Sequence, residues 1–173
     1  MKQYIVDAFT DTPSAGNPAA VCVLDAWPQD AVMQRLAKKN GLSETAFLVK
    51  EARGWHIRWF TPEMEEVLCG HATLASSFVL FRFIEPDSRS LRFCSRSGLL
   101  TVTRRGDLYE MDFPTYELKE VPVTEEMEQA FGIRPVKALL ALDLTCVFES
   151  EEEVREMVPD QDRLLLLPGR GRT

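Results

Sequence analysis

The sequence has few of the residues that build metal sites and disulfide frameworks. Histidine occurs twice, at positions 56 and 71, and the four cysteines, at 22, 69, 94 and 146, form no CxxC pair. Structural zinc sites combine about four Cys or His ligands at characteristic spacings, and disulfide-stapled domains carry sets of cysteines behind a secretory signal. The sequence therefore predicts reduced thiols, no metal and no other cofactor.

Positive charge and long apolar runs are scarce as well. Twenty Lys and Arg residues stand against 27 Asp and Glu residues, a net charge of −7, whereas nucleic-acid surfaces need clustered positive charge. The longest apolar run, at 78–83, is interrupted by Arg82 and is much shorter than the roughly 20 residues of a membrane-spanning helix. The first residues, MKQYIVD, lack the pattern of a signal peptide. We expect a cytoplasmic protein that binds neither nucleic acid nor membrane.

What is present is an ordinary globular composition with β-rich patterning. The 173 residues are 45% hydrophobic and 27% charged, and a chain of this length can bury about two thirds of its unfolded surface. A helix is expected between Pro28 and Gly41, where apolar residues recur at helical spacing. Short runs rich in Val, Ile and aromatic residues predict strands at 3–9, 19–24, 45–49, 55–60, 91–94, 99–103 and 108–113.

The segment ATLASSFVLFRF, at 72–83, differs in kind from the rest. Small and apolar residues cover every face of the helix that it predicts, so this helix should be buried on all sides. Many short strands around one such helix predict an α+β fold, in which a barrel-like, mostly antiparallel sheet wraps around a central buried helix. Phe113-Pro114 ends the pattern, and we assign the first domain to residues 1–115.

A second, smaller domain is predicted at 116–173. Thr115–Pro122 is typical of a linker, and Thr124 is followed by glutamates that suit the start of a helix. SEEE, at 150–153, has the form of a capping box that opens another helix. Two strands are expected between these helices, at 136–142 and 145–148. So short a segment is too small for a closed core of the first kind, and we expect an incomplete domain.

Two short segments carry residues that could take part in catalysis or binding. GLSETAFL places the lone carboxylate of Glu44 at the entrance of an apolar strand, and LCGHATLA places Gly70 and His71 at the start of the buried helix. Taken singly, a glutamate at a strand entrance is usually solvated, and a histidine in a first helical turn is usually structural. Cys69 is more often a small buried apolar residue.

Taken together, the two segments predict a site for proton transfer on an anion. The N–H groups of Gly70, His71 and Ala72 begin a helix, where unpaired donors and a partial positive charge attract anions. A poorly solvated carboxylate such as Glu44 can accept a proton and return it near neutral pH. An anion cradle that faces one acid/base carboxylate is what the relocation of a proton on a small carboxylic acid requires.

Four ordered motifs make the sequence resemble the PhzF-like family of phenazine biosynthesis: GNPAAV at 16–21, LSETAFL at 42–48, WFTP at 59–62 and LCGHATLA at 68–75. The resemblance implies two similar domains of the diaminopimelate-epimerase type, with the active site in the cleft between them. It implies that Glu44 is the acid/base, that Gly70, His71 and Asn17 bind the substrate, and that the reaction isomerises an acid of the dihydro-hydroxyanthranilate type. We expect a homodimer that acts on a small carboxylate.

The resemblance also predicts a missing part. Members of this family are much longer, and their second domain supplies a DPVTGSAH-like segment with an Asp and a Ser at the site. No such segment occurs in this sequence. We therefore expect a chain that is truncated within its second domain.

Two other functions remain open. An amino-acid epimerase or racemase of the related fold would use Cys69 as one of two opposed bases, although the CGH context differs from the CGN that this class prefers. Its activity should survive Glu44→Gln and be lost with Cys69→Ala, whereas the isomerase should lose activity with Glu44→Gln. Alternatively, the chain is a non-catalytic remnant that self-associates through uncovered apolar surface.

Overall fold

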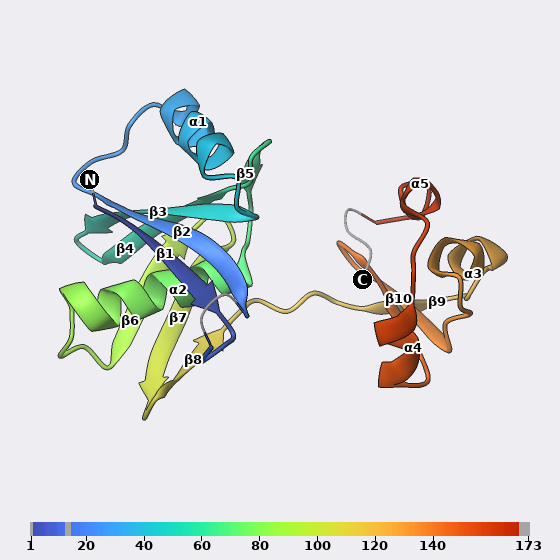
Figure 1. Ribbon diagram of the computed structural model, residues 1–173. Coiled ribbons are helices and arrows are strands. Elements are labelled where there is room, and N and C mark those ends of the chain that lie inside the picture. The colour runs from blue at the N-terminus through green and yellow to red at the C-terminus, as the bar shows by residue number, and fades with distance from the viewer. Residues whose placement is uncertain (1, 13–14, 170–173) are drawn as a thin grey trace. The chain divides into compact units, whose positions relative to one another are not determined.

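The chain divides at Pro114 into two units, which the computed structural model describes over residues 2–12 and 15–169 (Figure 1). Each unit has its own hydrophobic core. Within these described ranges, no helix is long and apolar enough to cross a membrane. Glu44 and His71 both belong to the first unit, and the fold of that unit determines how they meet.

The first unit is built on one curled sheet of eight strands. The strands are β1 (Lys2–Ala8), β2 (Asn17–Leu24), β3 (Glu44–Glu51), β4 (Gly54–Phe60), β5 (Glu65–Glu66), β6 (Ser90–Ser95), β7 (Gly98–Arg105) and β8 (Leu108–Asp112). They lie in the order β1-β2-β3-β4-β6-β7-β8, and the short β5 pairs with β4. The pairs β2–β3 and β4–β6 are parallel, and the other five pairs are antiparallel. The prediction of a mostly antiparallel sheet is confirmed.

Helix α2 (Gly70–Val79) lies inside the curl of this sheet and continues into a π-helical turn, η1 (Leu80–Ile84). Its alanines, such as Ala72, are buried and let the strands pack closely. Its hydroxyl side chains can be buried because each is satisfied by a hydrogen bond to the helix backbone. Ser76 Oγ donates to the carbonyl of Ala72 at 2.7 Å, and Ser77 Oγ donates to the carbonyl of Thr73 at 2.8 Å. The prediction of a central buried helix is confirmed.

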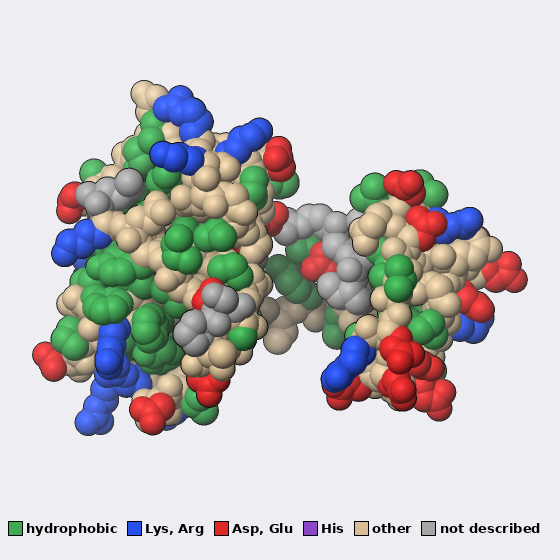
Figure 2. Space-filling model, viewed as in Figure 1, with side chains coloured by type: hydrophobic (Ala, Val, Ile, Leu, Met, Phe, Trp, Pro, Cys, Tyr) green, Lys and Arg blue, Asp and Glu red, His purple; other side chains and the backbone are tan. Residues whose placement is uncertain are grey.

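One stripe of α2 differs from the expected burial on all sides. Phe78 is 37% exposed, and together with Leu74 it lines a groove of about 1130 Å³ between β1 and β8, the two edges of the sheet. Figure 2 shows hydrophobic side chains gathered on this face of the first unit. The helical pattern cannot reveal this opening, because the opening depends on where the sheet stops short of closing.

Helix α1 (Asp30–Asn40) covers the outer face of the sheet. Met33 and Ala37 are buried against Phe47 of β3 and Phe60 of β4. The helix ends at Gly41, whose φ of 63° is in the left-handed region that glycine favours. Helix α1 connects β2 to β3 as a crossover. These strands therefore run parallel and begin at the same end of the sheet.

Gly54, at the turn between β3 and β4, allows β6 to approach. Its φ is 136°, and a Cβ atom added there would lie 2.5 Å from the carbonyl oxygen of Arg92 in β6. We expect Gly54→Ala to lower the free energy of unfolding of the first unit more than Gly98→Ala does, by about 1–3 kcal/mol. Gly98 has a similar φ of 100°, but a Cβ there meets no atom within 4 Å. Urea unfolding followed by tryptophan fluorescence measures both, and equal losses would contradict this prediction.

The second unit combines a small sheet with short helices. Strands β9 (Lys119–Val121), β10 (Lys137–Leu140) and β11 (Leu144–Val147) form an antiparallel sheet in the order β11-β10-β9. The helices are α3 (Glu125–Phe131), α4 (Glu151–Glu156) and α5 (Gln161–Leu164). The segment expected to be a linker is in part a strand, because β9 pairs with β10.

Both helix starts predicted in the second unit are confirmed. Thr124 Oγ1 accepts a hydrogen bond from the N–H of Met127 at 3.4 Å. Ser150 Oγ accepts from the N–H of Glu153 at 3.1 Å, and the carboxylate of Glu153 accepts from the N–H of Glu149 at 2.9 Å. The bond to Ser150 is the predicted N-cap, but the Glu153 carboxylate reaches the N–H of Glu149, one residue before the cap, rather than that of Ser150 as in a capping box.

Candidate functional site

The expected site residues stand at the starts of three elements. Asn17 is the first residue of β2 and Glu44 is the first residue of β3, and in this parallel pair Ala19 lies opposite Glu44. Gly70 and His71 open α2, which packs against β1, β2 and β3. The fold thus brings the two segments that the sequence singles out to the same end of the sheet, where β2 and β3 begin.

The carboxylate of Glu44 meets the imidazole of His71 in a nearly dry position. Glu44 Oε2 lies 3.2 Å from His71 Nε2, and the two side chains are 17% and 9% exposed. The distance is that of an ion pair, but the alignment is not that of a hydrogen bond, and neither atom has a hydrogen-bond partner among the described residues. Buried polar atoms are rarely left unpaired, since each costs about 1–3 kcal/mol. Both atoms are therefore available to a third group, such as a ligand.

Cys69 contacts the other nitrogen of the same imidazole. Its Sγ lies 3.5 Å from His71 Nδ1. Burial, reinforced by the negative charge of Glu44, raises the pKa of the Cys69 thiol to about 12, and the backbone amides of Ala72 and His71 oppose this shift without cancelling it. The thiol is therefore protonated at neutral pH and can donate a hydrogen bond.

The imidazole of His71 is neutral near pH 7. Burial lowers the pKa of His71, and the charge of Glu44 acts in the opposite direction without outweighing burial. A neutral imidazole carries one proton, so one ring nitrogen donates a hydrogen bond and the other accepts one. The cluster therefore holds a thiol, a neutral ring and a carboxylate in sequence.

The start of α2 supplies backbone donors beside this cluster. The N–H groups of a first helical turn have no acceptor within the helix. Cys69 precedes them in extended conformation, with φ −140° and ψ 121°, and its side chain makes no capping hydrogen bond. A Cβ atom built at Gly70 would meet nothing within 4 Å, so the space beside this amide is open. A carboxylate ligand can approach there.

Asn17 is exposed and contacts the residue that precedes Glu44. Its Oδ1 accepts a hydrogen bond from Ser43 Oγ at 3.1 Å. This bond ties the start of β2 to the residue that precedes Glu44. Direct binding of a substrate by Asn17 remains a prediction.

Glu44, Cys69 and His71 offer the donor types of a metal site, with one ligand atom from each within 4.8 Å of the others. Their arrangement does not favour one shared ion, because the sulfur approaches Nδ1 whereas the carboxylate approaches Nε2. The two nitrogens of an imidazole direct their lone pairs to different places. A thiol must also lose its proton before it can bind a metal. The three groups form a row, and the expected absence of a metal remains a prediction.

Two features are not indicated by the sequence pattern, one in the cluster and one in the core of the first unit. Cys69 contacts His71 because the extended residue before a helix turns its side chain back over the first turn. Trp59 Nε1 is a third buried polar atom without a hydrogen-bond partner in the part of the chain that is described. The alternating pattern of β4 predicts that the Trp59 ring is buried, but it does not predict that its N–H is left unpaired.

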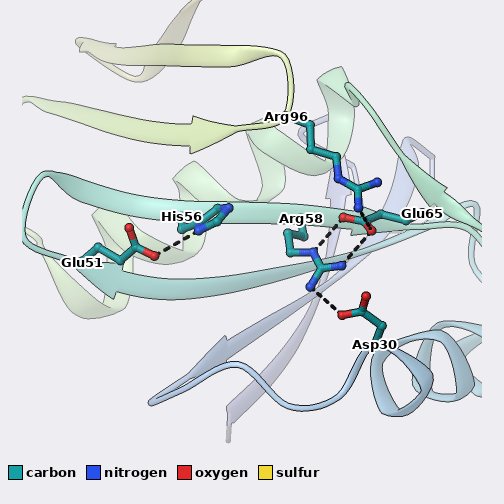
Figure 3. Close-up of polar contacts among 6 residues, drawn as sticks. All are labelled: Asp30, Glu51, His56, Arg58, Glu65 and Arg96. Atoms are coloured by element: carbon teal, nitrogen blue, oxygen red, sulfur yellow. Dashed lines mark hydrogen bonds and ion pairs between the residues drawn. The ribbon is translucent and has the colours of Figure 1, made fainter.

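A second cluster of charged side chains lies on the outer face of β4 (Figure 3). Arg58 donates two hydrogen bonds of 2.7 Å to Glu65 and one of 2.8 Å to Asp30, and Arg96 pairs with Glu65 at 2.8 Å. The hydrogen bonds with Glu65 are the main cause that raises the pKa of Arg58. A hollow of about 370 Å³ adjoins them, lined by Trp27, His56, Arg58 and Arg96. Since both guanidinium groups are paired with acids, the cluster indicates a structural network rather than an anion site.

Comparison with known proteins identifies relatives over nearly the whole sequence. A family model described as phenazine biosynthesis-like protein matches residues 6–171. A protein of Pseudomonas aeruginosa named as an uncharacterized isomerase is 50% identical over 167 residues, which are 96% of this chain and 64% of that protein. A second such isomerase of the same organism is 45% identical over 168 residues, 97% of this chain and 65% of that protein. The chain thus spans slightly less than two thirds of the length of these curated relatives.

Solved structures agree with the family model. A phenazine biosynthesis protein of the PhzF family from Enterococcus faecalis has a TM-score of 0.89 at 45% identity, over 98% of this chain and 68% of that chain. A predicted epimerase of Pseudomonas aeruginosa, with a TM-score of 0.74 at 21% identity over 98% of this chain and 68% of that chain, shares the fold. The epimerase-like α+β fold expected from the motifs is confirmed. The chain belongs to the phenazine biosynthesis-like family of PhzF proteins.

Proposed function

We propose that this chain carries the proton-transfer part of an isomerase active site, with Glu44 as the general acid and base. The observation that carries this proposal is the contact of Glu44 Oε2 with His71 Nε2, two buried atoms without hydrogen-bond partners in the described ranges. Relatives named as isomerases support the reaction class. The family to which the chain belongs supports the choice of a small carboxylic acid as substrate.

In this mechanism the substrate is a cyclic acid of the dihydro-hydroxyanthranilate type. Glu44 removes a proton from a ring carbon next to an unsaturated system, which spreads the developing negative charge. The same carboxyl group then returns the proton to another carbon on the same face, so that a double bond moves while the atomic composition is unchanged. One acid/base residue is sufficient for this exchange.

The first turn of α2 binds the carboxylate of the substrate in this mechanism. The N–H groups of Gly70 and His71 supply donors, and the positive end of the helix favours an anion. The His71 ring is neutral, which keeps Glu44 effective as a base. An imidazolium would bind Glu44 as an ion pair and weaken its basicity. Asn17 contributes through its bond with Ser43.

The racemase alternative, which uses Cys69 as a base, predicts a different dependence on pH. The pKa of this thiol is raised to about 12 by burial, so a thiolate base would make the exchange rate rise about tenfold per pH unit from pH 7 to 9. A reaction that uses the carboxylate of Glu44 needs no thiolate, so we expect no such slope. Solvent-exchange rates measured across this range distinguish the two, and a tenfold slope would favour Cys69.

The proposal is tested by incubating the protein in D₂O with a panel of cyclic, unsaturated hydroxy and amino acids. We expect deuterium to enter one ring carbon of a substrate while its double bond moves, as followed by NMR and mass spectrometry. A folded protein that catalyses no exchange on any member of the panel would contradict the proposal.

The homodimer and the cytoplasmic location expected from the sequence remain predictions. Light scattering at several concentrations measures the mass of the particle in solution. A monomer at every concentration would contradict the expected dimer.

A further inference from the structure

We propose that the thiol of Cys69 positions His71 by donating an S–H hydrogen bond to Nδ1, which holds the neutral ring as the tautomer with its proton on Nε2, beside Glu44. The catalytic purpose of this arrangement rests on the proposed function, but the tautomer is a property of the chain itself. Cys69 thereby acts through the imidazole and contacts no substrate.

The local geometry holds the thiol beside the ring. Cys69 is the last extended residue before α2, and Thr73 Oγ1 donates a hydrogen bond of 2.5 Å to its carbonyl oxygen. This bond fixes the backbone from which the thiol projects toward Nδ1, at 3.5 Å. Cys69 is 7% exposed and His71 is 8% exposed, so water has little access to compete for either group.

One tautomer fits the surroundings of both ring nitrogens better than the other. With the proton on Nε2, the Nδ1 lone pair accepts the S–H of Cys69. The Nε2–H group then lies beside the negative charge of Glu44, whose Oε2 is 3.2 Å from Nε2 but is not aligned for a hydrogen bond. With the proton on Nδ1, the Nε2 lone pair would face that oxygen, and two electron-rich atoms would be in contact. Burial strengthens both the attraction and the repulsion, because the surroundings screen charge poorly.

The state of the thiol decides the direction of this hydrogen bond. Burial and the charge of Glu44 raise its pKa to about 12, so the sulfur carries a proton at neutral pH and is the donor. Glu66 lies close enough to add to the same shift, and His71 itself remains neutral. The charged and titratable groups around the ring therefore act together to keep the proton on Nε2.

The consequence for the site is a donor that is fixed in place. The Nε2–H group lies beside Glu44 and has no hydrogen-bond partner among the residues described, so it is available to a ligand. Without the thiol, only the charge of Glu44 favours the proton on Nε2, so a larger share of the protein would carry it on Nδ1 and present a lone pair to the carboxylate. Cys69 would then affect turnover more than binding.

The tautomer can be measured without any substrate. Long-range ¹H–¹⁵N NMR at neutral pH distinguishes protonated from unprotonated ring nitrogens, and the sequence has only two histidines, His56 and His71, which His56→Gln assigns. We expect the Nε2–H form of His71 in the wild type and in Cys69→Ser, whose hydroxyl can still donate, and a mixture in Cys69→Ala. A wild-type Nδ1–H form, or an unchanged tautomer in Cys69→Ala, would overturn the proposal.

Cys22 provides a matched control. It is a buried thiol whose pKa burial also raises to about 12, and it contacts Gln3 Oε1 at 3.5 Å, away from His71. Cys22→Ala removes a buried thiol and should leave the His71 tautomer unchanged.

A kinetic readout separates positioning from packing. If the proposed isomerase activity is found, Cys69→Ala should lower kcat about tenfold or more with little change in KM, in the range typical of residues that orient a functional histidine, and Cys69→Ser should restore most of it. Equal kcat values in Cys69→Ala and the wild type would contradict the positioning role. If no activity is found, the NMR result still decides the tautomer. Failure of the proposed function can therefore be distinguished from failure of the positioning role of Cys69.

Discussion

Replacing Glu44 by glutamine is expected to lower the rate of proton exchange between substrate and solvent by about 10²–10⁴-fold, the usual contribution of a general acid/base. The substitution keeps the shape of the side chain and removes its charge and its ability to accept the proton. The side chain is 17% exposed, and its Oε2 has no hydrogen-bond partner within the described ranges. The fold therefore loses no bond at that atom, and the unfolding midpoint should change little. Deuterium incorporation measures the rate, and urea unfolding measures the stability.

The other end of the same strand offers a matched control for this substitution. Glu51 closes β3, is exposed, and pairs with His56 Nδ1 at 3.0 Å. Glu51→Gln is expected to leave the exchange rate unchanged. The assignment of Glu44 would be wrong if Glu44→Gln retained the wild-type rate. Loss of activity in Cys69→Ala together with its retention in Glu44→Gln would favour the racemase alternative instead.

The meeting of Glu44 with His71 is the part of the site that the sequence predicts. Each residue stands at the first turn or first position of an element that the hydrophobic pattern locates, and the fold brings those two starts together. The order of the groups around the ring could not be predicted. It depends on the backbone angles of Cys69 and on which nitrogen faces the carboxylate, and neither is encoded in a spacing along the chain.

The fold is predicted where the pattern is local and is missed where pairing is long-range. The curled sheet around one helix follows from the apolar faces of residues 72–83, and this feature is confirmed. The sequence does not indicate the parallel pairs, the gap between β1 and β8, or strand β9. The residues of β9, Lys119–Val121, are mostly polar, and their strand conformation is decided by β10 rather than by their own propensity.

The network around Arg58 also escapes prediction from the sequence. In β4, Trp55, Ile57 and Trp59 face the core, so the period-two pattern assigns Arg58 to a solvated face. That face is covered instead by residues distant in the sequence, and the Arg58 side chain is 15% exposed. Whether the face of a strand opposite the core is buried depends on which other segments pack over it. The alternating pattern of the strand itself does not contain that information.

Arg58→Met is expected to lower the free energy of unfolding of the first unit by about 3–5 kcal/mol, as for other buried pairs that lose one partner. Methionine keeps an apolar chain beside the rings of Trp27 and Phe60, whose centroids lie 5.5 and 5.2 Å from the guanidinium carbon. It removes three hydrogen bonds and leaves Glu65, 11% exposed, beside the largely exposed Arg96. Tryptophan fluorescence during urea unfolding reports on this unit alone, because the three tryptophans are at 27, 55 and 59.

Arg105→Met is the control that separates burial from the number of hydrogen bonds. Arg105 also donates two hydrogen bonds to one carboxylate, that of Glu110, at 3.3 and 3.0 Å, but these side chains are 63% and 60% exposed. Exposed pairs contribute about 0–1 kcal/mol, so we expect a much smaller loss than for Arg58→Met. Both changes remove a guanidinium from the same sheet, so the difference between them measures the cost of leaving Glu65 buried without its main partner. Equal losses would contradict a structural role for the Arg58 network and would reopen its hollow as a candidate binding site.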